Sequence, residues 1–395
     1  MNERAGIVII GGGIIGTAVA YHLAKRGVAS DVLVLEQNTV GSGTTSAAGG
    51  GIRSQFSTAV NIAFSIESVA FWRRWDEEIG LPVDYREEGY LLLATTPEER
   101  EQFKRNVALQ NSLGVPSRFV EPEEAARILP GLFVGDLSGG AYNASDGKAG
   151  PNEAAQAFAR RARERGVRIR EGTTITGMDV RDGRVLAVRT SSGTVDTENV
   201  VIAAGPWSGV VGRMAGVDVQ VHPHRRTIFV SERFDLLPKR FPVLMDIHAG
   251  WACTRDGDGV HMSGETDKTE SFDRHIDWSH LATSAEHALH RYPLIAGARF
   301  GKKAYAGTYD TTPDNHAIVG EAPEVKGLFV CAGFSGHGFQ HSPAAGRVMA
   351  DLVLDGRAGG FDIAPLAMTR FKDGTQLWEP LTAYAGTLGP PPAAR

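Results

Sequence analysis

The stretch Gly6-Ile-Val-Ile-Ile-Gly-Gly-Gly-Ile-Ile-Gly16 decides the fold of this chain. Its apolar run, residues 7–10, is short and β-branched, which predicts a strand buried on both faces. The run ends at a G-x-G-x-x-G formed by Gly11, Gly13 and Gly16. The first glycine permits a tight turn, the second lets a pyrophosphate approach the backbone, and the third lets helix and strand pack closely.

A helix is expected behind this turn, ending at Gly27, and a second buried strand over residues 32–35. Glu36 follows that strand, 20 residues after Gly16. At this place a carboxylate accepts hydrogen bonds from the ribose diol of a dinucleotide. With strand, helix and acid all present, a purely structural glycine turn is the weaker interpretation, and the open choice is between NAD and FAD.

Composition excludes several classes of function. The chain of 395 residues is 42% hydrophobic and 22% charged, an ordinary balance for a soluble protein of two intertwined domains. A net charge of −5 without basic runs argues against a nucleic-acid partner. Cys253 and Cys331 are too few for a disulfide framework or a cysteine metal site, and indicate buried thiols in a reducing cytoplasm. No stretch approaches a membrane span, so a soluble cytoplasmic protein is expected.

The segment Gly41-Ser-Gly-Thr-Thr-Ser-Ala-Ala-Gly-Gly-Gly-Ile-Arg53 cannot build a core. It offers close backbone approach and N–H donors, so it either wraps a ligand or is a mobile linker. We favour the ligand, because the segment lies between the nucleotide-binding unit and an amphipathic helix expected over residues 61–80. Arg53 is then expected at the ligand.

The middle of the chain predicts an inserted domain. A strand is expected over residues 89–95 and helices over 97–111 and 121–129, with no glycine turn of the phosphate-binding type. The block 84–147 therefore predicts an insertion with its own sheet. Strands with polar turns between 219 and 300 predict a second pass through the same domain.

A hairpin meander separates the two passes. Short strands are predicted over residues 174–180, 184–190 and 194–196, followed by a strand from residue 199 and a helix opened by Gly205-Pro-Trp-Ser208. An antiparallel meander crossing over a parallel sheet suits an FAD-binding variant of the dinucleotide fold better than a plain NAD domain.

The last third predicts a second glycine loop in front of a helix. A turn-rich loop is expected over residues 304–320 and a strand over 328–331, followed by the loop from Gly333. Ser342 as N-cap and Pro343 at the first helical position predict where the helix begins.

Two helix N-termini at opposite ends of the chain need two negative targets. A flavin dinucleotide supplies both, because its pyrophosphate suits the first and the N1/C2=O edge of the isoalloxazine, which gains charge on reduction, suits the second. NAD has no second anionic locus of this kind, which favours FAD.

The chain resembles the glycine/D-amino-acid oxidase (DAO) family from residue 6 to about residue 356. Within it, the chain is most similar to sarcosine oxidases, the sarcosine oxidase β subunit and the β subunit of FAD-dependent L-proline dehydrogenase. These motifs are far more specific for the family than for a substrate. They are Gly11-Gly-Gly-Ile-Ile-Gly16, Gly41-Ser-Gly with Gly50-Gly-Ile-Arg53, Ala203-Ala-Gly-Pro-Trp207, Tyr309-Asp-Thr-Thr-Pro-Asp314 and Gly333-Phe-Ser-Gly-His-Gly-Phe-Gln340.

The pattern and the resemblance together predict an α/β protein with an FAD-binding Rossmann-like domain, containing a parallel sheet and a β-meander. A discontinuous α+β substrate domain with a mainly antiparallel sheet completes it. The expected boundaries are 1–83, 148–218 and 302–380 for the FAD-binding domain, 84–147 and 219–301 for the substrate domain, and 381–395 for a disordered tail.

The resemblance implies hydride transfer from an amine Cα–H or N-methyl group to flavin N5, giving an imine that water hydrolyses, without a metal. It implies a carboxylate-bearing amine substrate held by Arg53, with Tyr309 and His337 on the pocket wall. Gln340 matches the carboxylate-binding lysine of monomeric sarcosine oxidases. A guanidinium beside a ligand-wrapping loop suits bidentate carboxylate binding, although Arg53 could pair with the protein or a flavin phosphate instead. His337 could simply hydrogen-bond the flavin.

Two further matches bear on the cofactor and the electron acceptor. Gly307 stands where monomeric sarcosine oxidases carry a flavin-linking cysteine, which implies non-covalent FAD. Their oxygen-activating lysine falls at His261 or Met262, so the acceptor is O₂ or another oxidant. The expected substrate is sarcosine, proline or another N-methyl amino acid. The alternatives are oxidation of glycine or a D-amino acid, or a flavin-bearing subunit without activity alone, in a homo- or hetero-oligomer.

The residues expected to bind the cofactor come from every glycine-rich segment of the chain. They are Gly11, Gly13, Ile14, Ile15, Gly16, Glu36, Gln37, Gly41, Ser42, Thr45, Ser46, Gly50, Gly51, Ile52, Ile175, Ala204, Gly205, Trp207, Gly307, Gly333, Ser335, Gly336, His337, Gly338, Phe339 and Gln340.

Overall fold

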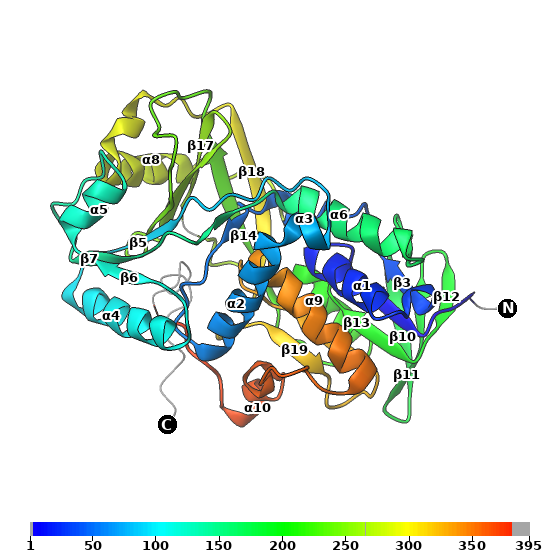
Figure 1. The fold of residues 1–395 in the computed structure, drawn as a ribbon. Coiled ribbons are helices and arrows are strands. Elements are labelled where there is room, and N and C mark those ends of the chain that lie inside the picture. The colour runs from blue at the N-terminus through cyan, green and yellow to red at the C-terminus, as the bar shows by residue number, and fades with distance from the viewer. Residues whose placement is uncertain (1–2, 265, 381–395) are drawn as a thin grey trace.

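The structure, a computed structural model, describes residues 3–264 and 266–380. The tail predicted over 381–395 lies outside the described residues. One part of the molecule is built on a largely parallel sheet with helices beside it, and the other on a large mixed sheet (Figure 1). This is the mixed α/β fold that the sequence predicts.

The glycine turn belongs to a six-stranded sheet of order β19-β20-β13-β2-β3-β9. Neighbouring strands run parallel except for the pair β19 and β20. The strands predicted at 7–10 and 32–35 are confirmed. The six strands are β2 (Ile7–Ile10), β3 (Val32–Leu35), β9 (Arg168–Arg170), β13 (Asn199–Ile202), β19 (Ile318–Glu321) and β20 (Leu328–Ala332).

Strand β2 is buried on both faces because its side chains alternate between two apolar clusters. Ile7 and Ile9 pack with the helices α1 (Ile14–Lys25), α6 (Pro151–Glu164) and α9 (Gly338–Asp355). Val8 and Ile10 pack toward the meander on the other face. The helices α1 and α9 lie against each other in Figure 1.

The predicted meander is confirmed and covers one face of the parallel sheet. It forms a four-stranded sheet of order β1-β12-β11-β10, in which the N-terminal strand β1 runs parallel to β12. Its strands are β1 (Glu3–Arg4), β10 (Ile175–Arg181), β11 (Arg184–Thr190) and β12 (Gly193–Asp196).

Both passes through the second part of the molecule contribute to one eight-stranded sheet, of order β18-β14-β17-β16-β15-β5-β7-β6. Strand β5 pairs in parallel with β15, so the block 84–147 shares its sheet with the second pass rather than having its own. The strands are β5 (Tyr90–Ala94), β6 (Arg118–Val120), β7 (Gly139–Asn143), β14 (His222–Val230), β15 (Val243–Asp246), β16 (Trp251–Asp256), β17 (Gly259–Ser263) and β18 (Lys303–Thr311).

Helices cover both faces of this sheet because strand β5 is apolar on each side. Leu92 faces the cluster of α4 (Pro97–Ser112), whose start carries the capping box of Thr96 and Glu99. Leu91 and Leu93 face the cluster of α5 (Pro122–Ile128) and α8 (His280–Arg291). Figure 1 shows α4 on one side of the strands and α5 and α8 on the other.

The turn-rich loop predicted over 304–320 is wrong. Residues 303–311 form β18, which pairs with β14 over its full length, from His222–Thr311 to Val230–Lys303. The glycine and polar residues of this segment are typical of a loop. They form a strand because each residue from 303 to 311 pairs with a residue of β14. Residues 312–317 keep the turn, with Asn315 at a positive φ of 58°.

The helix predicted over 61–80 is two helices, α2 (Ala59–Arg73) and α3 (Trp75–Glu78). Helix α2 is buried around most of its circumference instead of on one face, because α9 packs on it and its apolar residues belong to the large cluster on one face of the parallel sheet. Trp72 is fully buried, and its indole N–H donates to the carbonyl of Gln340 at 3.0 Å.

The predicted start of the last helix is also wrong. Helix α9 begins at Gly338 after His337, and Pro343 lies inside it. Proline cannot donate to the carbonyl of Phe339, one turn earlier. The hydroxyl of Ser342 donates to that carbonyl instead, at 2.8 Å, which lets the helix continue through the proline.

The remaining short elements are β4 (Gly51–Ile52), which pairs with β8 (Gly147–Lys148), and the helices α7 (Ser208–Arg213) and α10 (Arg370–Asp373). Of the helices in residues 3–264 and 266–380, none has the length and apolar composition needed to span a bilayer.

Candidate cofactor and substrate site

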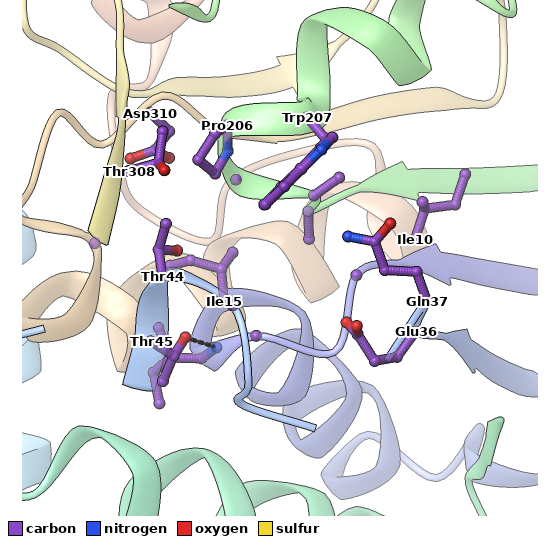
Figure 2. A pocket seen from close by; sticks show the side chains of 18 of the residues that line it. Ile10, Ile15, Glu36, Gln37, Thr44, Thr45, Pro206, Trp207, Thr308 and Asp310 are labelled. Carbon is purple, nitrogen blue, oxygen red and sulfur yellow. Dashed lines mark hydrogen bonds between the residues drawn. The ribbon is translucent and has the colours of Figure 1, made fainter. Parts of the chain in front are cut away.

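One pocket is lined by both glycine loops, which lie near opposite ends of the chain. Its wall includes five residues of the first glycine turn and four of the second, namely Ile10, Gly11, Gly13, Ile14 and Ile15, and Phe334, Gly336, Gly338 and Phe339. Between them it is lined by parts of the segments 43–48, 173–175 and 203–214. Figure 2 shows Glu36 and Gln37 on one side of the pocket and Thr308 and Asp310 on the other.

The turn at Gly11 has no room for a side chain. Its φ is +111°, and a Cβ there would lie 2.3 Å from the carbonyl oxygen of Ala203. The amide of Gly12 donates to Glu36 Oε2 at 2.7 Å, and Asn38 N donates to Oε1 at 2.8 Å. These bonds hold the Glu36 carboxylate at the pocket, and each oxygen keeps a lone pair for a ribose hydroxyl.

The N-terminus of α1 opens into the pocket with no acidic residue in its first turn. The Thr45 hydroxyl accepts from Ile14 N at 3.0 Å, the bond drawn in Figure 2. Residues 41–53, which we call the wrapping segment, are thereby fixed to the N-terminus of α1. A cradle of backbone N–H groups at a positive helix end fits the diphosphate of a dinucleotide.

The other end of the pocket is formed by β18 and the second glycine loop. Asp310 Oδ2 accepts from the amides of Gly333 and Phe334 at 2.9 and 3.1 Å, which ties the loop to the strand. Burial raises the pKa of Asp310 to about 6. The buried Thr308 hydroxyl lines the pocket and has no hydrogen-bond partner among the described residues. A Cβ at Gly307 would lie 2.8 Å from Ala47 Cβ, so this position has no side chain and no room for one.

Arg53 lies beside this end without lining the large pocket. Its amide donates to Gln340 Oε1 at 3.0 Å, which joins the wrapping segment to the first turn of α9. Its guanidinium carbon lies 3.9 Å from the ring centroid of Phe56, and Nη1 donates to the carbonyl of Gln55. The side chain is buried and makes no ion pair with a carboxylate in the described parts of the chain. Its other N–H groups are available to an anion.

His337 is a neutral imidazole in this structure. Its Nε2–H donates to the carbonyl of Asn315 at 3.2 Å, and Nδ1 has no partner among the described residues. Burial, assisted by the nearby Arg53 charge, lowers the pKa of His337 to about 3. The amide nitrogen of Gln340 is likewise buried and unpartnered among those residues. His337 Nδ1 and Gln340 Nε2 are therefore two buried polar atoms near Arg53 that a bound ligand would satisfy.

A buried carboxylate holds the segment that carries Arg53. Asp146 Oδ1 accepts from Ser54 N at 2.8 Å and from Asn143 Nδ2 at 3.0 Å, while Oδ2 accepts from Gln55 Nε2 at 3.1 Å. Burial raises the pKa of Asp146 to about 7, against the opposing effect of these bonds and of the Arg53 charge. Nothing in the local sequence around Asp146 marks it as part of a site.

The pocket wall contains sixteen of the residues predicted from the sequence: Gly11, Gly13, Ile14, Ile15, Glu36, Gln37, Thr45, Ile175, Ala204, Gly205, Trp207, Gly307, Tyr309, Gly336, Gly338 and Phe339. Twelve others lie outside that wall: Gly16, Gly41, Ser42, Ser46, Gly50, Gly51, Ile52, Arg53, Gly333, Ser335, His337 and Gln340. Several of these shape it indirectly. Gly41 N donates to Gly12 O at 2.9 Å, and a Cβ at Gly51 would lie 2.0 Å from the Tyr90 hydroxyl. The roles of both groups stay predictions.

Sequence reasoning missed other residues of the wall, among them Pro206, Arg274, Thr308 and Asp310. The pocket positions of Thr308 and Asp310 could not be predicted, because the sequence predicts a loop where the structure has β18. The β-favouring residues Tyr305, Thr308, Tyr309 and Thr311 are the one signal in this segment that could have indicated a strand.

A parallel sheet with a glycine turn, an overlying meander, and a pocket that continues to a second glycine loop define a dinucleotide-binding flavoprotein. The chain belongs to the DAO family of FAD dependent oxidoreductases, whose model matches residues 6–352. The resemblance stated from the motifs is confirmed, and FAD is the cofactor of this family. The glycine cradle, Glu36 and the unpartnered Thr308 hydroxyl fit that group.

The chain is 31% identical to the glycine oxidase of Geobacillus kaustophilus, over 94% of this chain and 98% of that protein. It is also 31% identical to the mitochondrial sarcosine dehydrogenase of Mus musculus, over 90% of this chain but only 40% of the longer relative. Among solved structures, L-proline dehydrogenase from P. horikoshii is similar with a TM-score of 0.88 and 32% identity, covering 95% of this chain and all of that one.

Proposed function

We propose that this protein oxidises a small secondary amino acid, such as proline, sarcosine or another N-methyl amino acid, to an imine that water hydrolyses. When bound, FAD supplies the electron acceptor, because flavin N5 takes up a hydride. The observation that carries the proposal is Arg53, a buried guanidinium without a carboxylate partner in the described residues, beside the end of the cofactor pocket. Similarity to proteins named for proline and sarcosine supports a secondary amino acid, and similarity to a glycine oxidase supports amino acids more generally.

In this proposal Arg53 binds the substrate carboxylate through two N–H groups. Gln340 and Phe56 hold the arginine in place. His337 adds no second charge, because burial keeps its imidazole neutral, and its free Nδ1 can accept a hydrogen bond from the substrate amine. Tyr309 lines the wall of the cofactor pocket. Non-covalent FAD follows from the missing side chain at Gly307.

The test is anaerobic mixing of the purified FAD-loaded chain with L-proline, sarcosine, glycine and D-alanine. Bleaching of the flavin absorbance by the secondary amino acids is expected, and subsequent air shows whether O₂ accepts the electrons. Bleaching only by glycine or D-alanine would favour the alternative substrates. Absence of any bleaching by the single chain would favour a subunit that needs a partner, as the similarity to a sarcosine oxidase β subunit allows.

Arg53 is tested with the best substrate and with its carboxamide analogue. Arg53→Ala should raise KM for the carboxylate about 10- to 100-fold, since a charge-assisted hydrogen bond contributes about 1.5–3 kcal/mol. Arg53→Lys keeps the charge and should recover part of that loss. Wild type should use the carboxamide no better than Arg53→Ala does. Equal KM values for the carboxylate in wild type and Arg53→Ala would remove Arg53 from this role.

A further inference from the structure

A loop of the second part of the molecule lies across the mouth of the cofactor pocket. We call residues 266–277, between β17 and α8, the covering loop. The Phe272 ring stacks on Trp207, with centroids 5.3 Å apart and planes inclined by 24°. The guanidinium of Arg274 donates to the carbonyl of Ser42 at 3.2 Å, and both Trp207 and Arg274 line the pocket. Figure 2 shows Trp207 on the side of the pocket away from Thr45.

One arginine of β14 holds this loop in place. Arg225 binds Asp267 at 2.8 Å, Asp273 at 3.0 Å and Asp277 at 3.4 Å. It also donates to the carbonyl of His275 at 3.3 Å. A single guanidinium therefore fixes the beginning, the tip and the end of the covering loop.

Arg274 is not part of that network. Its guanidinium makes no ion pair with a carboxylate in residues 3–264 and 266–380. Of the described residues that line the pocket, Arg274 is the single cation, and Glu36 and Asp310 are the two acids. Ser42, which it contacts, belongs to the same turn as Thr45, and Thr45 is bonded to the start of α1. Arg274 thus lies near the part of the pocket where the N-terminus of α1 would bind a diphosphate.

We propose that Arg274 binds the diphosphate of the dinucleotide from outside, opposite the N-terminus of α1, and that the covering loop retains the cofactor. A diphosphate carries two negative charges, and backbone N–H groups alone leave them without a counter-charge. The stack of Phe272 on Trp207 holds the covering loop against a second part of the pocket wall. The loop is part of the domain that contributes β14 and β18, so release of the cofactor requires this contact between the two parts of the molecule to open.

The test measures equilibrium binding of FAD, ADP and riboflavin to the apoprotein, by flavin fluorescence for FAD and riboflavin and by competition for ADP. Arg274→Met should raise the Kd of FAD and of ADP about five- to tenfold at low ionic strength, and leave riboflavin unchanged. The difference should shrink as salt screens the charge. Arg274→Lys should retain most of the affinity.

Lys268→Met is the matched control, because it removes one positive charge from the same loop at an exposed position away from the pocket wall. It should leave all three Kd values unchanged. Arg225→Met frees the loop and should speed FAD dissociation. The melting temperature of the apoproteins shows whether Arg274→Met folds like wild type.

Three outcomes would overturn the proposal. The first is a Kd for FAD and ADP within twofold of wild type in Arg274→Met at low salt. The second is an equal loss in Lys268→Met, which would indicate a general charge effect. The third is a loss confined to riboflavin, which would place Arg274 at the ring. None of these measurements depends on turnover, so they stand apart from the test of the amino-acid substrate.

Discussion

The buried carboxyl of Asp146 should make the stability of this protein depend on pH in an unusual direction. Burial raises its pKa from 3.8 to about 7 in the folded state. A raised carboxyl pKa means that ionisation is harder in the folded than in the unfolded chain. Folding therefore loses stability as the pH rises above 3.8, and the loss is complete once the pH exceeds about 7.

The magnitude follows from that interval. From pH 5 to pH 7 the folded chain loses stability over about two pH units, at roughly 1.36 kcal/mol per unit. The free energy of unfolding therefore falls by about 2.7 kcal/mol over this range. With about 2.1 cal/mol/K of unfolding entropy per residue, a chain of 395 residues changes its melting temperature by about 3 °C for this energy. Asp146→Asn removes the titrating group and keeps an oxygen for the amide of Ser54.

The assay compares melting temperatures of wild type and Asp146→Asn at pH 5 and pH 8, with the same excess of FAD in each sample. The melting temperature of Asp146→Asn minus that of wild type should be about 3 °C higher at pH 8 than at pH 5. The exposed Asp76→Asn is the control for loss of an aspartate, and its gap to wild type should not change. A gap for Asp146→Asn that is the same at pH 5 and pH 8 within 1 °C would refute the reasoning.

Two other predictions concern the glycine turn and the C-terminal segment. Gly11→Ala should abolish FAD retention and lower stability by several kcal/mol, because its Cβ would lie 2.3 Å from the Ala203 carbonyl oxygen; flavin absorbance of the purified protein measures this. Gly27→Ala is the control, with a similar positive φ but nothing within 4 Å, and should cost only about 1 kcal/mol and keep the flavin. Glu379 is fully buried beside His316, which helps to hold the pKa of this carboxyl at about 2 against burial. A lowered carboxyl pKa stabilises the folded state above pH 4.5, and this stabilisation is lost as the pH falls toward 2. Glu379→Gln should therefore lower the melting temperature by about 4 °C at pH 7 and by less at pH 3. If Glu379→Gln lowered the melting temperature at pH 3 by as much as at pH 7, this reasoning would be contradicted.

The sequence by itself determined the nucleotide-binding unit. The strand, the glycine turn and Glu36 all lie within 36 residues, so local rules on turns, alternation and helix ends apply to them directly. The meander was equally predictable, because Asp182-Gly183 and Ser192-Gly193 mark its hairpin turns. The residue order also predicts the second glycine loop, but it predicts the first helical residue at Pro343 instead of Gly338, because the hydrogen bond of Ser342 that lets the helix include Pro343 is not visible in it.

The tertiary structure alone decided which distant segments meet around the pocket. The segment 303–311 looks like a loop until β14 offers it a partner strand. Asp146 reaches Ser54 only because β8, which follows Asp146, pairs with β4, which precedes Ser54 by two residues. The covering loop likewise reaches Trp207 and Ser42 through pairings on a distant sheet. Such contacts arise from long-range packing, and long-range packing leaves no periodic signal in the residues that it joins.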